Sequence, residues 1–136
     1  MEDMAYCHVI WVTYRIEITM KISAHFDEEE FMCPCGCGEY SMSALFIEKL
    51  ENARYLANIP FTINSGKRCE AHNLAIGGKK QSDHLVGKAA DISCTTAHGK
   101  FIILEALFQA GFKRIGVYKN FIHAGHNLDN AQEVVW

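Results

Sequence analysis

The sequence has 136 residues, of which 49% are hydrophobic, and its formal net charge is −3. This length and apolar content suit one domain that can bury its own core without disulfide bonds. A protein that binds nucleic acid needs a basic face to release the counterions of the phosphates. The acidic balance therefore argues against a nucleic-acid partner.

Residues 1–19 differ in character from the rest of the chain. The apolar run within 9–20 is interrupted by charges and is shorter than the roughly 20 residues that span a bilayer. The first residues are acidic, whereas a secretory signal begins with basic ones. We expect no membrane span, synthesis in the cytoplasm, and one domain over 20–136. Residues 1–19 are then either an added edge strand or a misannotated start.

Hydrophobic periodicity predicts the elements of the domain in chain order. A short helix opens at the acidic run 27–30, a longer one extends from a Ser43 cap to Asn58, and another covers about 100–110. Strands are expected at 61–64, 89–94, 114–118 and 121–124. The elements do not alternate as a βαβα series, so we expect an α+β domain with a small, mainly antiparallel sheet and flanking helices.

A long glycine-containing segment between the first two strands carries Arg68, His72 and His84. Long segments without periodicity are often functional. His84 precedes a stretch of small residues that turns into the strand bearing Asp91, and His123 lies on another strand. Two imidazoles and one carboxylate form a common ligand set for catalytic zinc, with the fourth position open. These residues therefore predict a zinc site.

Four segments closely resemble the family of zinc D-Ala-D-Ala carboxypeptidases and murein endopeptidases. They are Ser65 to Asn73, Gly77-Gly78, Ser82 to Asp91 and Gly116 to His123, within a likeness that extends from about Ile22 to Trp136. The resemblance implies the fold shared with lysostaphin-type enzymes and the hedgehog signalling domain. It also implies one zinc ion per chain, bound by His84, Asp91 and His123, and a substrate in the stem peptides of peptidoglycan.

The same resemblance assigns roles to other residues. Arg68 is expected to bind or polarise substrate, since its fork of donors suits a carboxylate or carbonyl oxygen. Ser82 either orders the loop or touches substrate. Relatives place an acid two residues after the last zinc ligand or three before it, where this chain has Gly125 and Asn120. His126 is the nearest substitute, as a base or as a stabiliser of the anionic intermediate; otherwise it is only a polar residue near the sheet edge.

The chain has six cysteines, which we expect to be thiols because no export signal is present. Cys33, Cys35 and Cys37 form a tight group. Its spacing differs from that of ordinary zinc modules, so two readings stay open. One is a structural loop with adventitious metal or redox reactivity, and the other is a second metal site.

Three functions compete at this stage. The first is a zinc peptidase, active as a monomer, that hydrolyses amide bonds of peptidoglycan at the bacterial cell wall. It would reach the wall as a phage lysis or tail-associated enzyme does, or by another route of export. The second is a zinc-containing binding protein of the same fold with impaired turnover, favoured by Gly125 and Asn120. The third is a redox or metal-storage module built on the cysteines.

Overall fold

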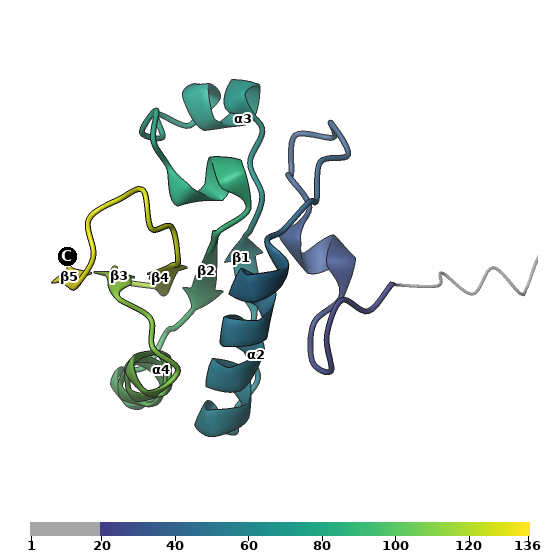
Figure 1. The fold of residues 1–136 in the computed structure, drawn as a ribbon. Coiled ribbons are helices and arrows are strands. Elements are labelled where there is room, and N and C mark those ends of the chain that lie inside the picture. Colours follow the sequence, from purple (N-terminus) through teal and green to yellow (C-terminus); the bar gives the residue numbers. More distant parts are fainter. Residues whose placement is uncertain (1–19) are drawn as a thin grey trace, which may run out of the picture.

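The computed structural model describes residues 20–136, so the edge strand considered for residues 1–19 lies outside the described part. The helical elements are η1 (Glu28–Phe31), α2 (Ala44–Ala57), α3 (Glu70–Ala75), η2 (Asp83–Val86) and α4 (Ala97–Gln109), where η marks a 3-10 turn. The strands are β1 (Ile63–Ser65), β2 (Ala89–Ser93), β3 (Arg114–Val117), β4 (Phe121–Gly125) and β5 (Val134–Val135). Figure 1 shows their arrangement.

The five strands form one sheet in the order β1-β2-β4-β3-β5. All neighbouring pairs are antiparallel except β3 and β5, which are parallel. The predicted α+β class with a mainly antiparallel sheet is therefore confirmed. In this register Asp91 on β2 lies directly opposite His123 on β4, which places both side chains on the same face.

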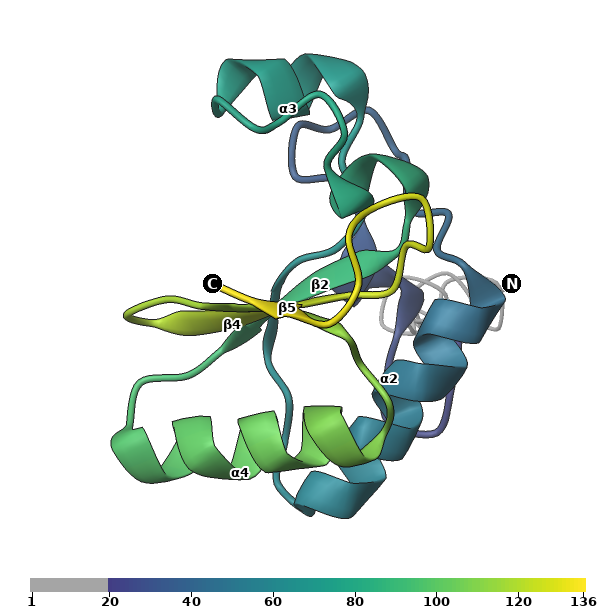
Figure 2. The same ribbon diagram turned by 60° about the vertical axis from the view of Figure 1, so that its left-hand side comes forward.

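The two long helices cover one face of the sheet, and the opposite face carries polar side chains. Figure 2 shows α2 and α4 on one side, with α3, η2 and the C-terminal segment on the other. The residues of the core under the helices include Leu50, Leu107, Ile92, Ile115 and Ile122. Because side chains alternate along a strand, burial of Ile92 and Ile122 in this core turns Asp91 and His123 away from it.

Local signals explain the boundaries of the helices. As predicted, the Ser43 hydroxyl caps α2, where it accepts a hydrogen bond from the backbone N–H of Phe46, and the helix ends at Asn58. Asn58 takes the left-handed conformation. Helix α4 begins before residue 100 because the Thr96 hydroxyl caps it by accepting from the N–H of Gly99. The predicted strands are confirmed with shifts of one or two residues at their ends.

Three short elements were not predicted: α3, η2 and β5. Helix α3 has six residues, and its N-terminal cap is the sulfur of Cys69 rather than one of the usual capping oxygens. Strand β5 has two residues and exists because the chain end pairs with β3. Within residues 20–136 we find no helix with the length and apolar character that crossing a membrane requires.

Candidate active site

Three predicted ligands meet on the polar face of the sheet. His84 comes from η2, Asp91 from β2 and His123 from β4. The Oδ1 atom of Asp91 lies 3.2 Å from Nε2 of His84 and 2.9 Å from Nδ1 of His123. The two imidazole rings are 5.0 Å apart between centroids, so all three side chains converge on one point.

The turn that carries His84 holds its ring in a fixed orientation. The Nδ1–H of His84 donates to the carbonyl oxygen of Gly66 at 2.6 Å, because a carbonyl can only accept. This bond leaves the Nε2 lone pair directed at the cluster, as in a metal-binding histidine. The hydroxyl of Ser82 accepts from the backbone N–H of His84 at 3.3 Å. Ser82 thus caps η2, a contact that suits the first of the two roles expected for it, the ordering of the loop.

Asp91 is ionised and shared between the histidines and Arg68. Burial raises the pKa of Asp91, but hydrogen bonds and charge from His123 and His84 hold it well below its usual range. Its second oxygen, Oδ2, lies 3.3 Å from a terminal nitrogen of Arg68. The same guanidinium donates to Ser65 and to the buried Asn73. The contacts with Ser65, Asn73 and Asp91 thus hold the guanidinium of Arg68 at the site.

The donor set fits zinc. Four ligands about 2.0–2.1 Å from a tetrahedral ion lie roughly 3.4 Å apart, close to the separations within the cluster. Burial, an ionised carboxylate and an imidazole with its tautomer fixed all favour a cation over an empty cluster. His84, Asp91 and His123 would therefore hold the ion, with a fourth position open to the cleft.

A buried carboxylate that sequence reasoning missed lies behind His123. Oδ2 of Asp83 is 3.9 Å from Nε2 of His123 and accepts from Nε of Arg114 at 2.9 Å, while Oδ1 accepts from Asn130. Burial raises the pKa of Asp83, but hydrogen bonds from His123, Arg114 and Asn130 hold it well below the usual range. Burial of the imidazole lowers the pKa of His123, but the carboxylates of Asp83 and Asp91 together raise it above its usual value. The only sequence signal was an aspartate next to a candidate ligand.

Asp83 also explains the glycine at position 125. A Cβ atom on Gly125 would lie 2.5 Å from Oδ2 of Asp83 and 3.3 Å from Nε2 of His123. A side chain on β4 at this position would therefore collide with the Asp83 carboxylate. The acid that the family resemblance leads us to expect at 125 is absent, and a carboxylate from η2 occupies the adjoining space.

The structure does not bring His126 to this cluster. His126 follows β4 and, by alternation, faces away from His123. Burial lowers its pKa, and so do the positive charges of Lys49 on α2 and Lys88. It is absent from the residues that line the cleft beside the ligands. This placement gives no support to the role expected for His126 as a base or as a stabiliser of the anionic intermediate.

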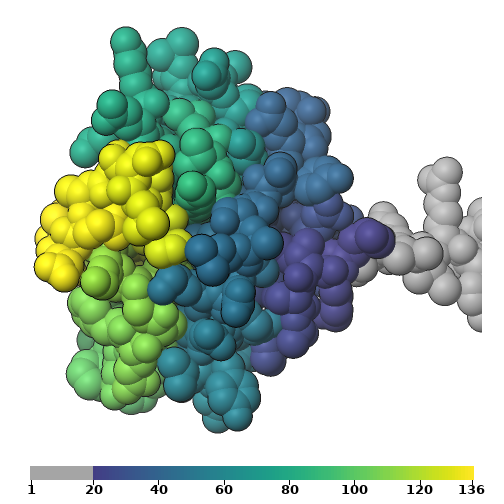
Figure 3. Space-filling model, in the orientation of Figure 1, coloured from purple at the N-terminus to yellow at the C-terminus, as the bar shows by residue number. Residues whose placement is uncertain are grey.

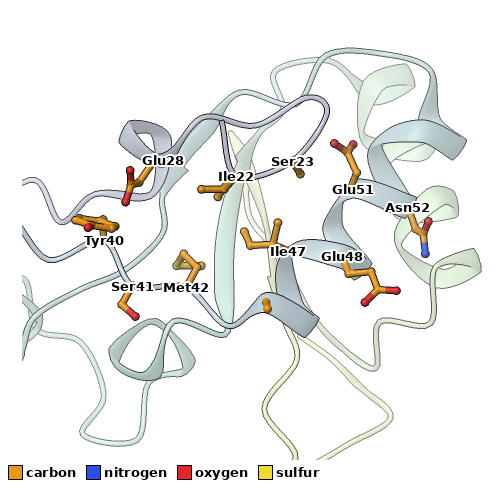
Figure 4. A pocket seen from close by; sticks show the side chains of 11 residues that line it. Ile22, Ser23, Glu28, Tyr40, Ser41, Met42, Ile47, Glu48, Glu51 and Asn52 are labelled. Atoms are coloured by element: carbon orange, nitrogen blue, oxygen red, sulfur yellow. The ribbon is translucent and has the colours of Figure 1, made fainter. Parts of the chain in front are cut away.

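A cleft of ≈ 470 Å³ opens beside the three ligands. One of its walls is aromatic: Tyr118 stacks on Phe121 at 4.4 Å between ring centroids, and Trp136 donates its indole N–H to the Tyr118 hydroxyl. The C-terminal segment, yellow in Figure 3, lies against the teal segment that contains η2, in line with the bonds from Asn130 to Gln81 and Asp83. A separate hollow at α2, shown in Figure 4, contains none of the three candidate ligands.

Fold and site together define a class of protein: an α+β domain with a His-Asp-His cluster, able to hold a metal ion, on the polar face of its sheet. The family model for Peptidase M15 matches residues 24–125. The chain therefore belongs to the peptidase M15 family, whose members are zinc-dependent peptidases. No match is found among curated proteins.

Proposed function

We propose that this protein is a zinc-dependent peptidase that hydrolyses amide bonds in the stem peptides or cross-links of peptidoglycan, as D-Ala-D-Ala carboxypeptidases and endopeptidases do. The observation that carries the proposal is the buried convergence of His84, Asp91 and His123 beside an open cleft. Family membership supports the reaction class. The bacterial cell wall is then its place of action.

The residues of the chain have separable tasks in this reaction. Zinc, when bound, supplies Lewis acidity toward a carbonyl oxygen and makes a water in its open position more acidic. The carbonyl of Gly66 fixes the tautomer of His84, so that Nε2 is free to bind the ion, and Asp91 contributes one negative charge. The guanidinium of Arg68 lies at the rim of the same cleft, where it can pair with a substrate carboxylate or carbonyl.

Replacing Arg68 by lysine is expected to lower kcat/KM about 10- to 100-fold, the effect typical of losing an outer-shell partner of a metal ligand. Lysine keeps the charge, but it cannot reproduce the three directed contacts with Ser65, Asn73 and Asp91. Steady-state kinetics on a stem peptide would measure the change. The matched control is Arg54→Lys on α2, outside the cleft. Unchanged kinetics in Arg68→Lys would remove Arg68 from the proposed machinery.

The proposed function is tested by digesting purified muropeptides with the zinc-loaded protein, with and without a chelator. New amine termini and the matching mass changes are expected, together with their loss on chelation and their return with zinc. Mass spectrometry identifies the bond that is cut. A protein with a verified full zinc content that releases no amine would contradict the proposal.

A second candidate function is a zinc-containing protein that binds wall peptides with impaired turnover. The specific observation is that the cleft beside the ligands has two side-chain carboxylates, Asp83 and Asp91, among the described residues that line it. Both are committed to ion pairs. Many zinc peptidases use as their base a carboxylate that is free to take a proton.

Equilibrium dialysis with muropeptides distinguishes the active peptidase from the impaired binding protein. An impaired binding protein retains muropeptides in equilibrium dialysis and leaves them intact, whereas a peptidase releases shortened products. Restoring the acid of relatives requires the double variant Asp83→Ser with Gly125→Asp, because Gly125→Asp alone places Cβ against the Asp83 carboxylate. A large gain in rate in the double variant would show that the natural chain is impaired.

A further inference from the structure

Four cysteine side chains meet outside the peptidase cleft. Three of them, Cys33, Cys35 and Cys37, follow η1, and Cys69 caps the first turn of α3 more than thirty residues later. The four sulfur atoms lie within 4.8 Å of one another. Cys69 is the member that the sequence motif of three cysteines did not reveal. We refer to these four residues as the cysteine cluster.

The spacing of the sulfur atoms matches a tetrahedral thiolate site. The Sγ atoms are 3.5 Å apart for Cys33 and Cys35, 3.5 Å for Cys35 and Cys69, and 3.8 Å for Cys33 and Cys69. Four sulfurs held about 2.3 Å from one zinc ion are roughly 3.8 Å apart. All the cysteines within residues 20–136 are free thiols. The cluster therefore has the size of a four-cysteine zinc site.

Backbone N–H groups point at the sulfurs as they do around a metal thiolate. Glu39 donates to Cys37, Cys69 donates to Cys33, and His72 donates to Cys69. Such bonds offset the negative charge of thiolates and fix their directions. Gly36 and Gly38 have φ values of +86° and +80°, a conformation that glycine adopts without strain. These two glycines let the chain turn sharply on either side of Cys37.

We propose that Cys33, Cys35, Cys37 and Cys69 bind a second zinc ion, which is structural. All four positions are filled by protein ligands, so the site is closed and has no place for a substrate. Each ligand binds as a thiolate, and the protons of the thiols leave to solvent. The chain then holds two zinc ions rather than the one expected from its family resemblance.

The second ion fastens the segment that carries Arg68. Cys69 follows Arg68 directly in the chain, and the N–H of Lys67 donates to the carbonyl of Phe31 at 2.9 Å. At the same junction a Cβ on Gly66 would lie 2.7 Å from Cα of Phe31, so the two segments are in close contact. The ion would join them through Cys33 and Cys69. It would thereby position Arg68, and the carbonyl of Gly66 that orients His84.

Metal counting tests this proposal independently of peptidase turnover. The full chain, purified without chelators, is expected to contain two zinc ions by inductively coupled plasma mass spectrometry. Cys69→Ser and His123→Gln are each expected to contain one, and Cys94→Ser, which changes a buried cysteine outside the cluster, two. One zinc in the unmodified chain that is lost in His123→Gln and kept in Cys69→Ser would overturn the proposal.

Measurements on chains with an intact cysteine cluster cover the case in which Cys69→Ser does not fold. Cobalt substituted into His123→Gln is expected to give the intense visible bands and thiolate charge-transfer absorption of a tetrahedral thiolate site. The cluster thiols are expected to resist alkylation until a chelator is added, with a fall in Tm on chelation. If the cobalt-substituted variant shows no charge-transfer absorption, the proposal of a metal in the cysteine cluster is wrong. The same holds if the cluster thiols react equally with and without chelator. Loss of peptide hydrolysis with an intact zinc count would refute the proposed function alone.

Discussion

His123→Gln is expected to lower kcat/KM at least about 10³-fold, because a metal that stabilises a transition state contributes several kcal/mol. His123 faces Asp91 through Nδ1 at 2.9 Å, and it is the ligand supplied by β4. Its ring lies in the cleft rather than in the core under the helices, so the fold should survive the substitution. Hydrolysis of a stem peptide, zinc content and circular dichroism measured together would check these three expectations.

His126, three residues after His123, provides a matched control. His126→Gln makes the same chemical change on the side of the sheet that faces Lys49, and it should leave the zinc content unchanged and the rate within about threefold. A rate in His126→Gln as low as that of His123→Gln, with zinc retained, would instead make His126 a participant in proton transfer. Full activity in a folded His123→Gln variant would remove this residue from the site.

Asp83→Asn is expected to destabilise the fold by about 2–4 kcal/mol at pH 7, since breaking a buried ion pair leaves a charge without its partner. The Asp83 side chain is 1% exposed, and it accepts from both Arg114 and Asn130. An asparagine amide can accept on one side, but it presents donors to the other. Urea unfolding of both proteins at matched zinc content would give the difference.

The pH dependence of this difference has a definite sign. The pKa of Asp83 is lowered in the folded state, so its ionised form stabilises the protein above the unfolded value of about 3.9. That contribution is lost as the pH falls through this value toward the lower folded pKa. The gap between wild type and Asp83→Asn should therefore close at acid pH. The exposed Asp129→Asn control should stay within about 0.5 kcal/mol of wild type, and a similar small effect in Asp83→Asn would refute the expectation.

Local patterns were sufficient to predict the long elements and to indicate His84 and Asp91 as candidate metal ligands. Helix α2 has a serine cap, an apolar stripe and a left-handed final residue, all of which act within a few turns of chain. His84 and Asp91 are joined by a short stretch of small residues, whereas His123, on another strand, was added as the third candidate by the family resemblance. For the helix and for the pair His84 and Asp91 the physical cause is local, so the sequence reveals them.

Contacts between distant segments decided the rest. The cysteine cluster became a four-ligand site because the tertiary fold places Cys69 beside three cysteines that precede it by more than thirty residues. Hydrogen bonds from Arg114 and Asn130 hold the buried carboxylate of Asp83 beside His123. In this position the carboxylate leaves no room for a side chain at 125, where the chain has glycine. Strand alternation separated His126 from His123. The sequence by itself determined the class of fold and the three candidate ligands, whereas the tertiary structure decided which side chains surround them, because that depends on the register and packing of the sheet.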